Sequence, residues 1–238
     1  MKNIGSVKED LNIEKRISIT PETVKKFIRL GFIVNLEKNY AEHIGINDEE
    51  YKNSGANLIS SKEGVLEKSD IILKVNCPSK DEVNLIKNKS ILVGQFDLNN
   101  NKDIINKLIQ KDVKFFSLNL LPRITRAQSM DVLSSQANLA GYKSVIESFA
   151  NFERAIPMMM TAAGTIPAAK ILVVGAGVAG LQAIATAKRM GAIVFATDVR
   201  IASKEQVESL GGKFLTIESS ENLETEGGYA KAATEDFK

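Results

Sequence analysis

Several residue types that mark particular classes of protein are scarce in this chain of 238 residues. A single cysteine, Cys77, excludes an internal disulfide and a cysteine-based metal cluster, and it suits a reducing cytosol. A single histidine, His43, excludes any mechanism that needs two histidines. The formal net charge is only +2, which gives no indication of a polyelectrolyte partner. We therefore expect no metal site and no nucleic-acid binding.

Long apolar runs are missing as well. No stretch of about 18 uncharged apolar residues is present, so no membrane span is predicted, and the first residues lack the apolar core of a signal peptide. Hydrophobic residues make up 44% and charged residues 25% of the chain, which is typical of a soluble globular protein rather than a disordered one. We expect a cytoplasmic protein that is large enough for one large or two small domains.

Short apolar runs alternate with helical patterns along the chain. Helices are predicted from Thr20-Pro21, a cap followed by a first-turn proline, and over Asn101–Lys111, where apolar residues recur at helical spacing. Such alternation favours parallel sheets covered by helices on both faces. The runs typical of buried strands are Phe32–Leu36, Asp70–Val75, Ile91–Phe96, Val113–Leu118, Ile171–Val174 and Ile193–Thr197.

The most informative motif follows the apolar run Ile171–Val174, which leads into Gly-x-Gly-x-x-Gly and then into a helical pattern. Gly175 allows a tight turn, Gly177 lets a pyrophosphate approach the backbone, and Gly180 lets the helix pack closely against the strand. The start of the helix offers unpaired N–H groups and the positive end of a dipole to an anion. The motif is typical of dinucleotide binding.

An acidic residue stands where this motif requires one. Asp198 ends the next predicted strand, close to the spacing of about 20 residues that is typical of the motif. Its carboxylate can accept both ribose hydroxyls of an adenosine and repels a 2′-phosphate, which favours NAD(H) over NADP(H). Arg200 is near enough to weaken that preference. The alternative is a glycine turn that serves packing alone, with Asp198 as a cap at the end of the strand.

The division into domains follows from these patterns. A change of composition after Pro122 and a helical pattern over 125–156, with a break near Gly141, separate two α/β regions, and 162–167 has the composition of a turn. We predict two Rossmann-like doubly wound domains joined by a long helix. The first spans residues 1–124, the connecting helix and turn span 125–164, and an incomplete second domain spans 165–238. The polar stretch 219–238 resembles a loop that is cut short.

A dense group of polar side chains lies where the long helix is expected to start. Arg123, Gln128, Asp131 and Ser134 occur together at the predicted boundary between the domains, where ligand clefts are common. The alternative interpretation is a capped helix start, with Asp131 at the positive end of the helix and the arginines facing solvent.

These segments, together with Asn138–Tyr142, Met158–Gly164 and Lys204–Phe214, closely resemble the NAD(H)-binding component of the proton-translocating NAD(P) transhydrogenase alpha subunit. That component is related to alanine dehydrogenase. The resemblance implies direct hydride transfer from NADH to NADP⁺, which needs orientation of two cofactors and no general acid or base. It further implies a homodimer that docks with an NADP(H)-binding component and membrane proton-channel subunits. The protein would then be cytoplasmic and peripheral at the inner membrane through these partners.

The resemblance also implies roles for individual residues. Orientation of the nicotinamide falls on Arg123, Gln128 and Asp131, which are the expected catalytic residues. Gly228 and Tyr229 match the loop that closes over bound nucleotide in that family. Contacts to NAD(H) are expected from those five residues and from Arg126, Ser134, Gly175, Gly177, Val178, Ala179, Gly180, Asp198, Val199 and Arg200.

Two other functions remain open at this point. An alanine dehydrogenase shares the fold, and Arg16 and Lys74 match its pyruvate-binding residues, although both also fit structural ion pairs. Gln95 or a neighbour stands where that enzyme has its catalytic histidine. The other alternative is a non-catalytic remnant, because an incomplete second domain leaves an open sheet edge and buries little apolar area. Such a chain is expected to be marginally stable and to bind NADH poorly, unless a complementing C-terminal chain supplies the missing strands.

Overall fold

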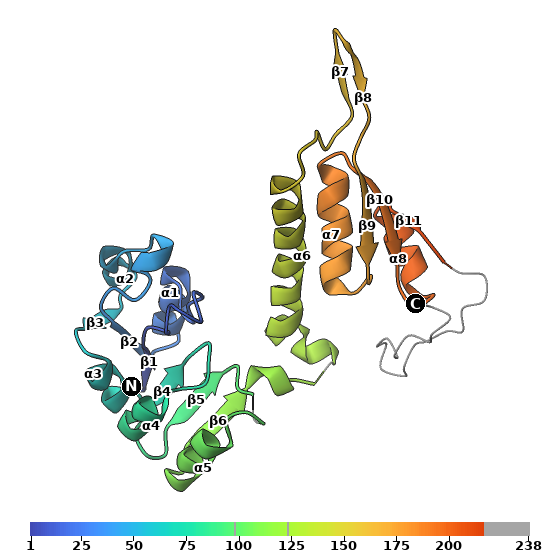
Figure 1. The fold of residues 1–238 in the computed structure, drawn as a ribbon. Helices are drawn as coiled ribbons and strands as arrows, with labels where there is room; N and C mark the ends of the chain where they lie inside the picture. The colour runs from blue at the N-terminus through green and yellow to red at the C-terminus, as the bar shows by residue number, and fades with distance from the viewer. Residues whose placement is uncertain (98, 123, 217–238) are drawn as a thin grey trace. The chain divides into compact units, whose positions relative to one another are not determined.

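The computed structural model describes residues 1–97, 99–122 and 124–216 (Figure 1). The described residues form two compact units, Met1–Asp131 and the residues from Val132 onward. Each unit contains a parallel sheet with helices packed on it, as the alternation of apolar runs predicts.

The sheet of the first unit has six parallel strands in the order β3-β2-β1-β4-β5-β6, which is the doubly wound order of a Rossmann fold. Its strands are β1 (Asn3–Ser6), β2 (Ile33–Glu37), β3 (Asn57–Ile59), β4 (Ile71–Leu73), β5 (Ile91–Gly94) and β6 (Lys114–Ser117). Ile4 of β1 pairs with Val34 on one side and with Ile71 on the other. The chain order therefore reverses between β1 and β4.

Short helices connect these strands, and side chains cap several of them. Thr20 accepts a hydrogen bond from the backbone N–H of Thr23 at 3.2 Å, and Pro21 follows in the first turn, so the predicted start is confirmed. The helices are α1 (Pro21–Arg29), α2 (Asp48–Asn53), α3 (Lys62–Lys68), α4 (Lys80–Leu85) and α5 (Lys102–Gln110), with 3₁₀ turns η1 (Glu42–Ile44), η2 (Leu118–Leu120) and η3 (Thr125–Met130).

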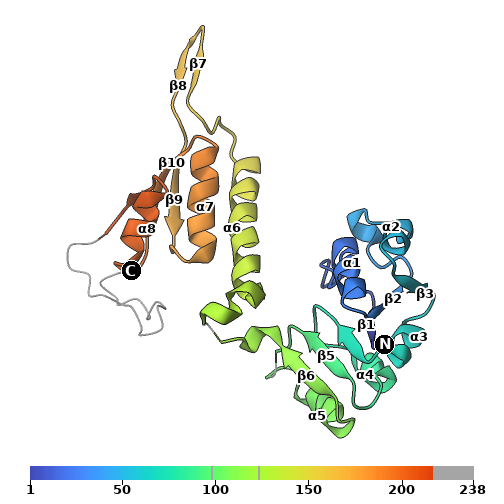
Figure 2. The same ribbon diagram turned by 180° about the vertical axis from the view of Figure 1, so that it is seen from behind.

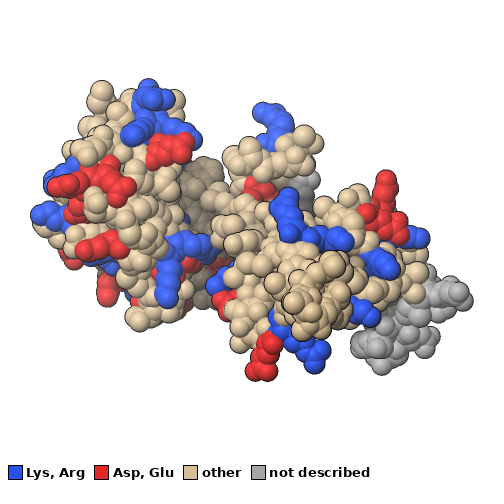
Figure 3. Space-filling view, turned by 90° about the horizontal axis from the view of Figure 1, so that it is seen from above, with Lys and Arg blue, Asp and Glu red and all other residues tan. Residues whose placement is uncertain are grey.

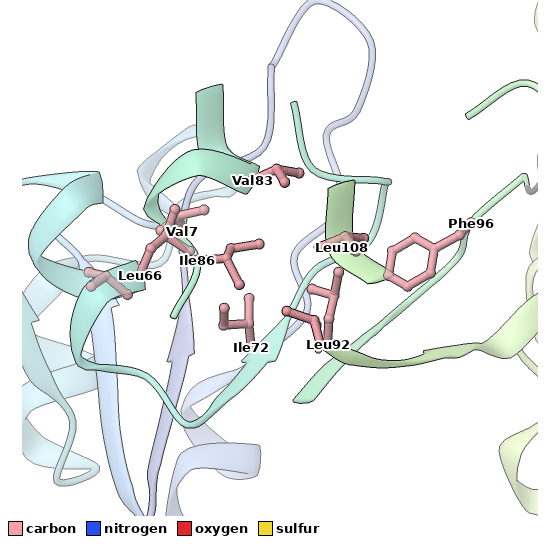
Figure 4. Close-up of a cluster of buried hydrophobic side chains, with 10 residues drawn as sticks. Val7, Leu66, Ile72, Val83, Ile86, Leu92, Phe96 and Leu108 are labelled. Atoms are coloured by element: carbon pink, nitrogen blue, oxygen red, sulfur yellow. The ribbon is translucent and has the colours of Figure 1, made fainter. Parts of the chain in front are cut away.

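Helices bury both faces of this sheet. Ile72 of β4 belongs to a cluster that includes Val7, Leu66, Leu92 and Leu108 (Figure 4). Its chain neighbours Ile71 and Leu73 pack against a second cluster, which contains Leu36, Tyr40 and Tyr51. Because successive strand residues point to opposite faces, the two clusters lie on opposite sides of the sheet.

The second unit contains half of such a sheet among its described residues, as an incomplete domain predicts. Its strands β9 (Lys170–Val174), β10 (Ile193–Thr197) and β11 (Lys213–Phe214) are parallel in the order β11-β10-β9. The helices are α6 (Val132–Ala150), α7 (Val178–Arg189) and α8 (Ser203–Ser209). A hairpin of β7 (Met159–Thr161) and β8 (Gly164–Ile166) extends away from the rest of the unit (Figures 1 and 2).

The long helix differs from its prediction. The expected helix over 125–156 is confined to the 19 residues of α6, because Asp131 leaves the helical conformation at ψ 86° and residues before it form the 3₁₀ turn η3. It also continues through Gly141 without the expected break. A Cβ at Gly141 would lie 2.0 Å from the carbonyl oxygen of Ala179, so glycine is needed there for contact between α6 and α7. The predicted turn at 162–167 is the tip and second strand of the hairpin.

Charge is spread rather than concentrated. On the face drawn in Figure 3, Lys and Arg side chains alternate with Asp and Glu. Among the described residues, no helix combines the length and the apolar composition that a membrane crossing requires.

Candidate functional site

The glycine turn joins the end of β9 to the start of α7. Gly175 has φ +93°, a left-handed conformation that favours glycine, and its N–H donates to the carbonyl of Thr197 at 2.8 Å. A Cβ at Gly180 would lie 1.8 Å from the carbonyl oxygen of Gly175. Two of the three motif glycines are therefore required by the turn itself and by close contact between helix and strand.

The third glycine has a different environment. Gly177 precedes α7 with extended backbone (φ −77°, ψ −168°), and an added Cβ there would meet no atom within 4 Å. Packing does not explain a glycine at this position, whereas free space beside the backbone suits a ligand. No side chain within the described ranges caps the helix. The amides of Val178, Ala179 and Gly180 lack intrahelical acceptors and stand at the positive end of the helix dipole, which together form an anion site.

Asp198 ties the end of β10 to this turn. Its Oδ2 accepts the N–H of Ala176 at 2.6 Å, and its Oδ1 accepts the N–H of Arg200 at 2.8 Å. Burial raises the pKa of this carboxyl, but hydrogen bonds from Arg200 and Ala176 more than offset that effect, and the net pKa lies below its ordinary value. The side chain is thus a fixed carboxylate beside the glycine turn, as the spacing of the motif predicts.

The guanidinium of Arg200 lies against the same carboxylate. Its Nε donates to Oδ1 and its Nη2 to Oδ2, both at 2.9 Å. The Arg200 side chain is 20% exposed and that of Asp198 only 5%. Val199, between them, is partly buried. The structure therefore brings together Gly175, Gly177, Val178, Ala179, Gly180, Asp198, Val199 and Arg200 of the predicted site.

The residues expected near the nicotinamide lie on two different elements. Arg126 and Gln128 are exposed on η3, and the carbonyl of Gln128 accepts the N–H of Asp131 at 3.2 Å. Ser134 is in the first turn of α6, which extends past the N-terminal end of α7 (Figures 1 and 2). Predicted site residues Arg123, Gly228 and Tyr229 lie outside the described residues. The shared role of this group stays a prediction.

The two cations that match alanine dehydrogenase are held in ion pairs. Arg16 donates to both carboxylate oxygens of Glu14 at 2.9 and 2.7 Å, and its Nη2 lies 3.4 Å from Oε1 of Gln95. Lys74 is buried, with its Nζ 3.1 Å from Glu82 and 3.4 Å from Glu9. Each cation thus has carboxylate partners within the chain.

Sequence reasoning missed those carboxylates. A signal for Glu82 was present in the sequence, because Ser79-x-x-Glu82 is a capping box and both of its hydrogen bonds form. Nothing local points to Glu9, which is brought to Lys74 by the pairing of β1 with β4. His43 is exposed and its Nε2 lies 2.8 Å from the carbonyl oxygen of Lys15, so the only histidine has a local structural contact.

A cavity of about 240 Å³ lies elsewhere in the second unit. Val145, Phe149 and Phe152 line it from the side of α6, and Ile171 and Leu172 line it from β9. It borders the beginning of β9, whereas the glycine turn follows the end of that strand. The cavity therefore belongs to the open edge of the sheet and not to the nucleotide-binding motif.

Comparison with known proteins agrees with the motif. The family model for the alanine dehydrogenase/PNT N-terminal domain matches residues 5–140, and the model for the C-terminal domain of the same family matches residues 144–233. The first of the polypeptides that make up the NAD(P) transhydrogenase subunit alpha of Rhodospirillum rubrum is 49% identical over 232 residues, which cover 94% of this chain and 60% of that protein.

Structural similarity leads to the same group. The crystal structure of a transhydrogenase from Sinorhizobium meliloti superimposes with a TM-score of 0.85 at 49% identity, covering 90% of this chain and 64% of that one. An alanine dehydrogenase of Methanococcus maripaludis is more distant, at 28% identity over 96% of this chain and 62% of that protein. The chain spans about three fifths of the length of these relatives.

Proposed function

This chain belongs to the alanine dehydrogenase/PNT family, and from that premise we propose that it is the NAD(H)-binding part of a proton-translocating NAD(P) transhydrogenase. The observation that carries the proposal is the bond from the Ala176 N–H to Asp198, which fixes a carboxylate beside a glycine turn with free space at Gly177. In this arrangement the amides at the start of α7 bind the diphosphate and Asp198 binds the adenosine ribose.

The same carboxylate sets the choice of nucleotide. Asp198 is ionised, since its pKa lies below the ordinary value, and a 2′-phosphate beside it would meet like charge. We therefore assign NAD(H) to this chain and NADP(H) to a partner component. The nicotinamide supplies the hydride when bound, and this chain holds it in a fixed orientation through Gln128 and Asp131, with Arg123 alongside them.

The turn offers a sharp test. Gly177→Val places a side chain where the chain itself has none within 4 Å, in a backbone conformation that valine tolerates, so folding should be retained while the diphosphate is excluded. Ala163→Val, on the exposed tip of the hairpin, is the matched control. NADH binding followed by ligand-observed NMR should be lost in Gly177→Val alone. Equal binding by the two variants would contradict the proposed site.

Orientation of the nicotinamide needs a kinetic test. Gln128→Asn shortens an exposed amide that lies in none of the hydrophobic clusters of the described chain, so it should not disturb folding. In a reconstituted enzyme with its NADP(H)-binding and membrane components, single-turnover hydride transfer should slow by a larger factor than NADH binding weakens. An unchanged single-turnover rate would reject this role for Gln128.

A partner surface supports the proposed assembly. Ile171 and Val173 of β9 pack with α7, whereas Leu172, Val174 and Ile193 on the other face are 57%, 79% and 39% exposed. Parallel sheets are normally covered on both faces. We propose that a complementing C-terminal polypeptide, of the kind that relatives carry beyond the matched three fifths, adds strands at β9 and covers this face. NADH binding by this chain alone should then be weak.

Complementation can be measured in trans. The chain is mixed with the C-terminal two fifths of the Rhodospirillum rubrum relative, and co-elution and NADH affinity are recorded. Val174→Lys should abolish both gains while leaving the isolated chain folded, because Val174 is largely exposed. Ile109→Lys, at an exposed position of the first unit, is the control. Tight NADH binding by this chain alone, or equal complementation by both variants, would overturn the proposed partner.

Association with further subunits follows from the same proposal. The chain forms a homodimer, docks with the NADP(H)-binding component, and is held at the inner membrane from the cytoplasmic side through proton-channel subunits. Light scattering of the complemented chain tests the dimer, and co-sedimentation with membranes that contain the partner subunits tests the location.

Alanine dehydrogenase activity is the competing function. It requires proton transfer to or from the substrate, and Gln95, beside Arg16, cannot perform that step as a histidine would. NADH formation from alanine and NAD⁺ by the complemented chain would favour this alternative over the transhydrogenase.

A further inference from the structure

The carboxylate of Asp198 has every acceptor position filled by its own chain. A carboxylate has about four lone-pair positions, two on each oxygen. The N–H of Arg200 and its Nε bond to Oδ1, at 2.8 and 2.9 Å. The N–H of Ala176 and the Nη2 of Arg200 bond to Oδ2, at 2.6 and 2.9 Å. A ribose hydroxyl that approached this carboxylate would find no lone pair free.

The four donors are of two kinds. Two are backbone amides, one on each oxygen, and they belong to the glycine turn and to the segment after β10. The other two are the paired N–H groups of one guanidinium, again one on each oxygen. A guanidinium and a ribose cis-diol both present two adjacent donors, so either group can fill the same pair of positions.

On this basis, which rests on the proposed function, we propose that the Arg200 guanidinium occupies the place of the ribose diol and must withdraw before a nucleotide binds. The two backbone amides keep Asp198 in its orientation when Arg200 leaves. Withdrawal is feasible because Arg200 is the more exposed partner, at 20% against 5% for Asp198. Arg200 is thus an internal competitor that lowers affinity for the adenosine half of the cofactor.

Removal of the guanidinium should strengthen binding. Arg200→Met keeps an apolar stem of similar length and leaves Asp198 with one free position on each oxygen. Arg189→Met, in the last turn of α7 and exposed, removes a cation at a distance from the carboxylate and is the matched control. The probe is ADP-ribose, which contains the diphosphate and the adenosine ribose but no nicotinamide. We expect binding about tenfold tighter in Arg200→Met, equivalent to about 1.4 kcal/mol, and no change in Arg189→Met.

The outcomes separate the inference from the function on which it rests. Equal or weaker binding of ADP-ribose by folded Arg200→Met, with measurable binding by the unaltered chain, overturns the competitor and leaves the nucleotide site intact. Failure of both proteins to bind at millimolar ADP-ribose overturns the proposed function. A second measurement covers a variant that fails to fold. In the unaltered chain the ¹⁵N resonance of Arg200 Nε should shift on addition of ADP-ribose, and saturation with ligand without any shift overturns the proposal.

Discussion

The contact between Gly141 and Ala179 links the long helix to the nucleotide-binding turn, and Gly141→Ala tests it. An added Cβ would lie 2.0 Å from the Ala179 carbonyl oxygen, whereas ordinary carbon–oxygen contacts are about 3.3–3.6 Å. The obstacle is backbone in the first turn of α7, so no side-chain rotation relieves it. Either α6 or the start of α7 must move by more than an ångström.

Two opposing terms set the size of the effect. Alanine in place of glycine within a helix gains about 1 kcal/mol from propensity. Overpacking of a close contact costs about 1–3 kcal/mol and occasionally more. Because the clash is with backbone, we take the upper end of that range and expect a net loss of about 2 kcal/mol in the second unit. A Gly141→Ala variant that behaved as an ordinary helical substitution would instead be more stable.

Hydrogen exchange of the α7 amides, measured by mass spectrometry on peptides from 178–189, is the suitable assay because the chain has two units and a single unfolding transition is not assured. A loss of about 2 kcal/mol raises exchange through opening by roughly thirtyfold. Asn138→Ala, exposed on the same helix, gains propensity without the clash and should slow exchange slightly. Exchange in Gly141→Ala no faster than in the unaltered chain would refute the contact.

Two further predictions concern stability. Lys111 donates through Nζ to the carbonyls of Val83, Asn84 and Ile86 at 2.8, 2.7 and 2.6 Å, so Lys111→Met should leave these acceptors at the end of α4 without a cation and lower the urea midpoint of the first unit by about 1–3 kcal/mol in free energy. Lys107→Met, exposed on α5, should change it little. Burial raises the pKa values of the Glu82 and Asp198 carboxyls, but lysine or arginine partners outweigh that effect, so both folded pKa values lie below the ordinary ones. Their stabilisation is therefore complete above the unfolded pKa and is lost as pH falls through the folded one. Urea midpoints should decrease below about pH 4.5, the ordinary value for glutamate, and midpoints that stay constant down to about pH 3 would contradict this.

Local patterns allowed much of the fold to be predicted. Ile193–Thr197 is a strand with the predicted bounds, and Thr20 caps α1 as expected, because runs of apolar residues and caps depend on neighbours in the sequence. The glycine turn was predicted for the same reason, since Gly175, Gly177 and Gly180 act within one short segment. Asp198 followed from spacing alone, and its side chain lies where the motif requires.

Two strands could not be predicted in this way. β1 and β3 are short and contain asparagine, which is depleted in strands. Their stability depends on their neighbours across the sheet. Asn57 donates through its side chain to Asn35 and Asn35 to Asn3, each at 3.2 Å, so three asparagines on β3, β2 and β1 satisfy one another. Such a ladder exists only after the strands are paired, and no single segment indicates it.

The segment around Gln128 shows where sequence reasoning has least to work with. Gln128, Asp131 and Ser134 are spaced three apart, and a continuous helix over 125–156 would have carried all three. Asp131 instead leaves the helical conformation, so Gln128 lies on a 3₁₀ turn and Ser134 on α6. The ψ of one residue decides this, and propensity differences of a few tenths of a kcal/mol cannot fix it. A role for Gln128 in orienting nicotinamide consequently depends on how a ligand orders this turn, and the separate measurement of hydride transfer and NADH binding in Gln128→Asn is the test that detects such an effect.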